Sequence, residues 1–98
     1  MSNDSSKEGW EGFLNVCLET HSHQALSELF NLFFTIEEKE TLSSRFLIIR
    51  ALLEGKLTQR EISEIYRVSI AQITRGSNAL KIARDELKTI LKKRMKPS

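Results

Sequence analysis

The sequence predicts an all-α protein, and three observations support that prediction. Apolar residues recur at helical spacing along most of the 98 residues. No segment alternates apolar and polar residues in the way that a half-buried strand does. Three pairs in which a hydroxyl residue precedes a Glu or Gln by three positions fit the pattern of a capping box at a helix start. The three pairs are Thr35 with Glu38, Thr58 with Glu61, and Ser69 with Gln72.

These signals divide the chain into an ordered series of helices. Residues 1–7 are polar and are expected to be disordered, and residues 8–98 are expected to form one all-helical domain. Within it we expect helices over 8–18, 24–33, 36–54 and 85–94, with a helix-turn-helix over 59–82. Gly55 is placed to end the third helix in the left-handed conformation. The buried stripes are expected to comprise Leu42, Phe46, Ile49, Leu52 and Leu53 on the third helix, and Leu87, Ile90, Leu91 and Met95 on the last.

The segment around the second helix is apolar on nearly every side. Its apolar residues are Leu26, Leu29, Phe30, Leu32, Phe33, Phe34 and Ile36. A helix of this kind must be covered on several faces, and a chain this short has little material to do so. We therefore expect a second subunit to cover it; the alternative is a central core helix in a monomer.

The most informative segment runs from Leu57 to Lys81. It has the outline of a helix-turn-helix, a unit that places its second helix in the major groove of DNA. The residues expected to meet across the turn are Ile62, Ile65, Tyr66, Val68 and Ile73. By the 3.6-residue period, Ile70, Ala71 and Thr74 should face outward, where such side chains suit contact with thymine methyl groups. The alternative is an ordinary helical hairpin with an exposed Ile.

The small net charge of +2 conceals a strong asymmetry along the chain. Residues 1–54 carry four basic and nine acidic residues, a net charge of −5, whereas residues 55–98 carry eleven and four, a net charge of +7. The basic half holds the helix-turn-helix. Phosphate binding needs such a concentration of cations, so the asymmetry favours DNA as a partner.

Several other classes of protein fit the sequence poorly. No run of about 18 apolar residues is present, so we expect no transmembrane helix and no membrane partner. The polar N-terminus does not resemble a signal peptide, and one cysteine, Cys17, cannot form an intrachain disulfide; both favour the cytoplasm. His21 and His23 lack further ligands at metal-binding spacing, so we expect no metal. Without paired carboxylates, a Cys–His arrangement or a phosphate-binding glycine loop, an enzyme is not expected.

Two stretches, ITRGSNALK and SSRFLIIRALLEGKLTQRE, resemble the bacterial tryptophan (Trp) operon repressor family. The resemblance covers about residues 10–95. It implies an intertwined helical homodimer with a helix-turn-helix DNA-reading head, and L-tryptophan as corepressor. The liganded dimer would bind operator DNA and repress genes of tryptophan biosynthesis or transport.

The resemblance also implies the residues of two sites. The ligand would be held by Arg45, Arg75 and Gly76, and by a corner of the partner subunit that contains Leu32, Phe34 and Thr35. Two guanidinium planes can sandwich an indole ring, and a guanidinium can also bind a carboxylate. Operator DNA would be contacted by Gln59, Arg60, Ser69, Ile70, Ala71, Thr74 and Lys81.

Three departures from the family pattern bear on these implications. Arg67 occupies a turn position that commonly holds Gly, and would be strained there if its φ is positive. Ala79 stands where the family often has a serine that contacts the ligand's amino group, so the ligand could be another indole compound. No helix breaker separates residues 82–85, so the last two helices could be nearly continuous. Two alternatives stay open: a helical protein-interaction adaptor, or a repressor of this fold with a different indole-type ligand or none.

Overall fold

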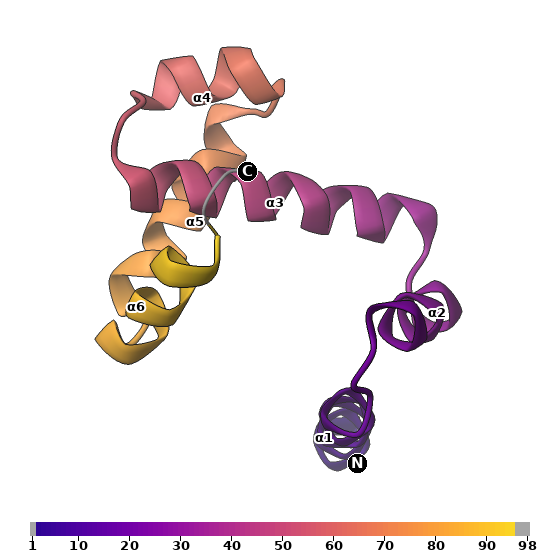
Figure 1. Ribbon diagram of the computed structural model, residues 1–98. Coiled ribbons are helices and arrows are strands. Elements are labelled where there is room, and N and C mark those ends of the chain that lie inside the picture. Colours follow the sequence, from indigo (N-terminus) through magenta and orange to yellow (C-terminus); the bar gives the residue numbers. More distant parts are fainter. Residues whose placement is uncertain (1, 96–98) are drawn as a thin grey trace. The chain divides into compact units, whose positions relative to one another are not determined.

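The computed structural model describes residues 2–95, and within this range all of its regular secondary structure is helical (Figure 1). The helices are α1 (Ser2–Leu18), α2 (His23–Phe33), α3 (Ile36–Glu54), α4 (Gln59–Tyr66), α5 (Ile70–Ile82) and α6 (Asp85–Arg94). The all-α prediction is therefore confirmed for this part of the chain. Contacts divide the chain into two units, one ending at Thr35 and the other starting at Ile36.

The first unit consists of α1 and α2, which meet through aromatic rings. The Phe13 ring lies 5.9, 5.3 and 5.8 Å, centroid to centroid, from the rings of Phe30, Phe33 and Phe34. Edge-to-face arrangements such as that of Phe13 with Phe34 are the favourable geometry for such pairs. A cluster of partly exposed aromatic rings thus holds the two helices of this unit together.

The N-terminus differs from the expected disordered segment, because α1 begins at Ser2. Residues 2–7 contain neither Gly nor Pro, and Asp4 lies in the first turn, where a negative charge interacts favourably with the helix dipole. Met1 and residues 96–98 lie outside the described residues. The start of α2 was expected at Gln24 and lies one residue earlier, because the Ser22 hydroxyl accepts a hydrogen bond from the Ala25 N–H at 3.0 Å.

The second unit packs α4, α5 and α6 against α3. Figure 1 shows α4 and α6 on opposite sides of the C-terminal half of α3, with α5 crossing that half. The buried core consists of Ile48, Ala51, Ile62, Val68 and Ile73, with Leu52, Leu57 and Tyr66 packed against it. Ile48, Ile62 and Ile73 are at most 1% exposed, so the core lies where the helix-turn-helix meets α3.

Part of the stripe predicted on α3 is not buried in the single chain. Leu42 and Phe46 are 49% and 46% exposed in the single chain, whereas Ile48 and Ala51, which the stripe omitted, are buried. The reason is that α3 is apolar on several faces, and α4 and α5 pack only against its C-terminal half. Ile65 was also expected at the α4–α5 contact, but it is 58% exposed. On α6, Met95 is buried as expected, whereas Leu87 and Ile90 are exposed.

The helix boundaries follow local signals closely. Gly55 adopts φ +69° after α3, as expected for a left-handed helix end. The last two helices are not continuous, because Ala83 and Arg84 are extended, with ψ of 144° and 147°. Asp85 and Glu86 then place negative charge in the first turn of α6, where it favours a new helix start. Among residues 2–95, no helix is both long enough and apolar enough to cross a bilayer.

Candidate functional site

The two helices of the helix-turn-helix begin at complete capping boxes, as the sequence predicts. The Thr58 hydroxyl accepts from the Glu61 N–H at 3.1 Å, and the Thr58 N–H donates to the Glu61 carboxylate at 2.8 Å. Ser69 and Gln72 make the same reciprocal pair at 3.1 and 2.8 Å. Each box satisfies two amide groups that would otherwise lack partners at a helix start. The start of α5, which a helix-turn-helix presents to DNA, is thereby fixed.

Ser63 fixes the turn between α4 and α5. Its carbonyl accepts hydrogen bonds from the N–H groups of Arg67 and Val68, the latter at 3.2 Å. Its hydroxyl donates to the Val68 carbonyl at 2.7 Å. This role was not predicted; its signal in the sequence is a hydroxyl residue in the last turn before the break. These bonds hold Arg67 in the left-handed conformation, with φ 56° and ψ 47°.

One face of α5 carries most of the predicted DNA-contacting residues. Ile70, Thr74 and Lys81 are all exposed. At 3.6 residues per turn they fall within about 40° of one another, and they span about 16 Å along the helix. Ala71 is also exposed and flanks this row, which we call the α5 stripe (Ile70, Ala71, Thr74 and Lys81). A continuous outward row of this length on a rigidly capped helix is suited to lie along a DNA groove.

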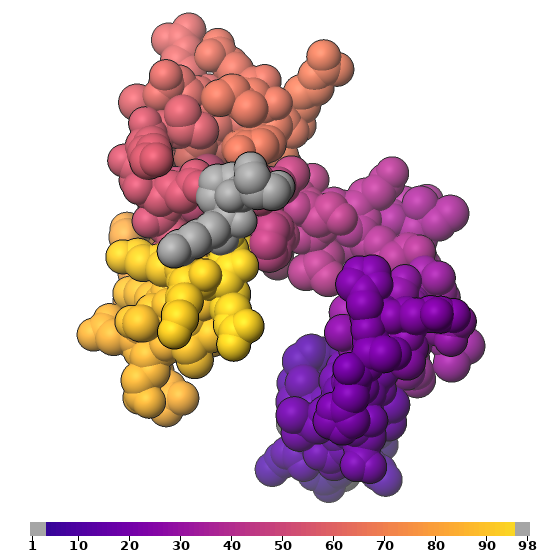
Figure 2. Space-filling model, viewed as in Figure 1, coloured from indigo at the N-terminus to yellow at the C-terminus, as the bar shows by residue number. Residues whose placement is uncertain are grey.

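The remaining predicted DNA-contacting residues lie at the starts of the two motif helices. Gln59 and Arg60 are exposed in the first turn of α4, and Ser69 is the exposed cap of α5. Figure 2 displays the surface over α4 and the start of α5 on one side of the second unit. The four cations of the motif, Arg60, Arg67, Arg75 and Lys81, are exposed and form no ion pair with any residue between 2 and 95. Their charges are therefore available to an anionic partner.

The two predicted ligand arginines are near one helix crossing. Gly76, which follows Arg75, approaches α3 at Ile48 and Ile49. Arg45 precedes these two residues by one helical turn, so it lies close to the same crossing. Both arginines are exposed, and neither forms an ion pair with a described residue. On α5, Arg75 lies about 100–140° around the helix from Ile70, Thr74 and Lys81, but only one turn from Ala71, so it borders the α5 stripe on the side of Ala71.

Gly76 has a packing role that its sequence pattern did not predict. A Cβ atom at this position would lie 3.0 Å from Ile48 Cγ2, 3.6 Å from Leu52 Cδ1 and 3.8 Å from Ile49 Cγ1. Gly76 is itself buried. The close approach of α5 to α3 therefore accounts for the glycine without a ligand, and the prediction that Gly76 contacts a ligand remains a prediction.

The three residues predicted at the closing corner belong to the first unit. Leu32 is 77% exposed on α2, Phe34 is half-buried directly after this helix, and Thr35 is exposed. Phe34 is anchored by its ring contacts with Phe13 and Phe30, whose centroids lie 5.8 and 5.2 Å away. The corner thus contains an exposed leucine and an aromatic ring that is held in place.

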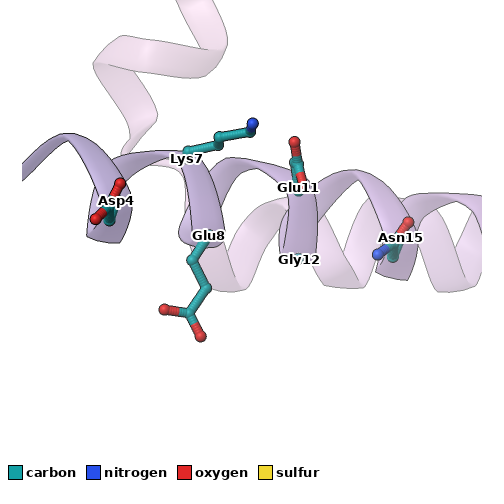
Figure 3. A pocket seen from close by; sticks show the side chains of 6 residues that line it. All are labelled: Asp4, Lys7, Glu8, Glu11, Gly12 and Asn15. Carbon is teal, nitrogen blue, oxygen red and sulfur yellow. The ribbon is translucent and has the colours of Figure 1, made fainter.

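Hollows in the surface of the first unit do not coincide with the predicted site residues, apart from Phe34. One of about 450 Å³ is lined by Asp4, Lys7, Glu8, Glu11, Gly12 and Asn15, all on α1 (Figure 3). Its side chains do not converge, since Glu8 points away from Lys7 and Glu11. A second, of about 220 Å³, is lined by Gly9, Trp10, Phe13, Phe33 and Phe34. Between residues 2 and 95 no three His, Cys, Asp or Glu side chains are grouped to hold a metal.

Comparison with known proteins identifies the family. The sequence profile of the Trp repressor protein family matches residues 8–95. A Trp operon repressor homolog of Chlamydia trachomatis serovar L2 is 51% identical over 90 residues, covering 92% of this chain and 96% of that protein. A Trp operon repressor homolog of Chlamydia caviae is 50% identical over 92 residues, covering 94% of this chain and 91% of that protein. One of Vibrio campbellii is 37% identical over 95 residues, covering 93% of this chain and 95% of that protein. The chain therefore belongs to the Trp repressor family, whose members are transcription regulators and not enzymes.

Proposed function

We propose that the protein is an L-tryptophan-dependent transcriptional repressor of the cytoplasm, which binds operator DNA as a homodimer and regulates genes of tryptophan biosynthesis or transport. The observation that carries this proposal is the α5 stripe, on a helix whose start is fixed by a capping box. In a helix-turn-helix the first residues of the second helix contact base edges. Ile70, Ala71 and Thr74 then meet the groove floor, directly or through water, and Gln59, Arg60, Ser69 and Lys81 bind phosphates or base edges.

Arg45 and Arg75 are suited to hold the corepressor. They lie near one crossing of α3 and α5, and no described residue neutralises either charge. Their planar guanidinium groups would stack on the two faces of an indole ring, and Arg75 would bind the carboxylate of the ligand. Leu32, Phe34 and Thr35 of the partner subunit would close the site, and Gly76 would border it.

A homodimer is supported by the apolar surface that the single chain leaves exposed. Trp10 is 61% exposed, Leu32 77% and Phe33 55%, and on α3 Leu42 and Phe46 are about half exposed. Apolar surface on this scale is unusual for a monomer of 98 residues and is typical of a protein whose core is shared between subunits. Intertwining of the two chains would cover these residues together.

The dimer would couple ligand binding to DNA binding through the spacing of its two reading heads. Trp repressor itself is among the helix-turn-helix proteins whose dimers bind half-sites about 34 Å apart, one turn of the duplex. A ligand between α3 and α5 would contact both the core helix and the reading helix, and would so stabilise that spacing. By linkage, L-tryptophan would then raise the affinity for the operator, and the operator would raise the affinity for L-tryptophan by the same factor.

The test is operator binding with and without L-tryptophan. A duplex is first selected by the protein from a random-sequence pool in the presence of L-tryptophan, and its dissociation constant is then measured with the ligand added and omitted. We expect tighter binding with L-tryptophan; equal affinity under both conditions would refute the gating. Indole-3-propionate, which lacks the amino group of L-tryptophan, is the matched comparison. It tests whether the amino group matters here, because Ala79 has no hydroxyl with which to bind it.

A further inference from the structure

Arg67 adopts a backbone conformation that an arginine rarely takes. It is the one non-glycine residue between 2 and 95 with a positive φ, at 56°. For a residue with a Cβ atom this left-handed region costs roughly 1–2 kcal/mol, whereas glycine enters it freely. A glycine at this position would therefore serve the turn better than the arginine that the chain carries.

Hydrogen bonds in the turn hold the backbone of Arg67 in this conformation. The Ser63 carbonyl accepts from the N–H groups of both Arg67 and Val68, and the Ser63 hydroxyl donates to the Val68 carbonyl. Val68 is anchored in turn by its side chain, which is only 6% exposed. The surrounding structure thus imposes the conformation of Arg67, which is the condition under which a strained residue persists.

No contact of the Arg67 side chain with the described residues explains why an arginine occupies this position. Tyr66 packs against the core and Val68 is part of it, but Arg67 between them is exposed. It forms no ion pair or side-chain hydrogen bond with any residue between 2 and 95. The arginine is thus placed outward at a strained position without an intramolecular partner.

We propose that Arg67 binds a phosphate of the DNA backbone, at the edge of the groove that α5 enters. This proposal rests on the proposed DNA-binding function and assigns one further contact to it. Arg67 precedes the Ser69 cap by two residues, so it lies just outside the helix that would enter the groove. The edge of a groove is formed by phosphates, and a planar guanidinium binds a phosphate through two parallel hydrogen bonds. Such a contact adds affinity that does not depend on base sequence.

The test is the salt dependence of binding by Arg67 variants. Arg67→Gly and Arg67→Asn suit the left-handed conformation and remove the charge, whereas Arg67→Lys keeps the charge. The probe is a labelled random-sequence duplex of about 30 base pairs, long enough for both half-sites of a dimer. Its association constant is measured by fluorescence anisotropy as a function of salt concentration. Lys7→Asn on α1 is the matched control, because it removes an exposed cation from the acidic half of the chain.

We expect the Gly and Asn variants to lower the salt slope by about 0.9 for each protomer bound. At 0.15 M salt this corresponds to a loss of affinity of about fivefold per protomer, equal for the random duplex and for a selected operator. Arg67→Lys and Lys7→Asn should keep the wild-type slope. The melting temperature of Arg67→Gly should not fall below that of the wild type, because glycine suits the turn.

The possible outcomes separate this contact from the proposed function. If the wild-type protein binds duplex DNA with a steep salt slope and Arg67→Gly keeps that slope, the phosphate contact is refuted and the function stands. If the loss appears on the selected operator and not on the random duplex, Arg67 reads bases and the phosphate assignment is wrong. If the wild-type protein shows no salt-dependent binding at all, the proposed function fails, and the contact fails with it.

Discussion

Substitution of Gly76 by Ala tests whether close packing of α5 on α3 is the reason for this glycine. Gly76 lies inside α5 and is buried. In an exposed helix interior, alanine is more favourable than glycine by about 1 kcal/mol. If nothing opposed the new methyl group, Gly76→Ala would stabilise the protein by about that amount.

The structure predicts the opposite sign. The new Cβ atom would lie 3.0 Å from Ile48 Cγ2, closer than ordinary van der Waals contact between carbon atoms. Ile48 is 1% exposed, and as a β-branched residue in a helix it has one strongly preferred side-chain rotamer, so it cannot swing aside. Overpacking of this kind costs roughly 1–3 kcal/mol. The gain in helix propensity offsets about 1 kcal/mol of this cost. We therefore expect Gly76→Ala to lower the free energy of unfolding by up to about 2 kcal/mol.

The measurement is urea denaturation followed by circular dichroism, at one fixed protein concentration because a dimer's stability depends on it. Ile48→Leu provides the partner variant, because it removes the Cγ2 methyl and keeps the volume of the side chain. In that background Gly76→Ala should cost less, so the double-mutant cycle should show a coupling of at least about 0.5 kcal/mol. A stabilised Gly76→Ala protein without coupling to Ile48 would refute the packing argument.

Three further predictions follow from the same helix. Arg75→Ala should abolish the response to L-tryptophan while the dimer stays folded; an unchanged tryptophan affinity by calorimetry would contradict the ligand assignment. Ile70→Lys should weaken operator binding with little effect on tryptophan affinity, because its side chain lies on the α5 stripe, away from Arg75. If tryptophan affinity falls in that variant, the two surfaces are misassigned. Ser69→Ala removes the α5 cap and should lower the free energy of unfolding by about 1 kcal/mol, as read from the urea midpoint. An unchanged midpoint would show that the cap does not stabilise α5.

Interactions that span three or four residues could be predicted from the sequence. The capping boxes at Thr58 and Ser69 are confirmed, as is the left-handed Gly55. Each depends only on residues a few positions apart, so the local sequence is enough to predict it. The outward face of α5 could be predicted for the same reason, since the helical period alone places Ile70 and Thr74 on it. The start of α2 was missed by one residue, although Ser22 carries an equally local signal.

Features that depend on tertiary packing could not be predicted in this way. Apolar residues lie on several faces of α3, and only the position of α4 and α5 decides that Ile48 and Ala51 are buried. Gly76 shows the same difficulty at the site, because its contact partner is 28 positions away in sequence. Arg45 and Arg75 carry no local pattern that distinguishes a ligand-binding arginine from a surface one. Their assignment came from the family resemblance and still depends on the binding experiments above.

The packing of α5 on α3 also explains why ligand binding and DNA reading would be coupled in a protein this small. Gly76 lets α5 approach α3 closely, so the helix that presents the α5 stripe rests directly on the core at Ile48. A ligand held by Arg45 and Arg75 would contact both helices at that same crossing. Because α5 is one continuous helix, a change in its tilt at the crossing would also move Ile70. Coupling would then depend on the contact between Gly76 and Ile48 as well as on the arginines. Gly76→Ala should therefore reduce the effect of L-tryptophan on operator affinity even at temperatures where the variant is fully folded. If that effect is instead unchanged, the ligand must act on the reading helix by a route that does not pass through this crossing.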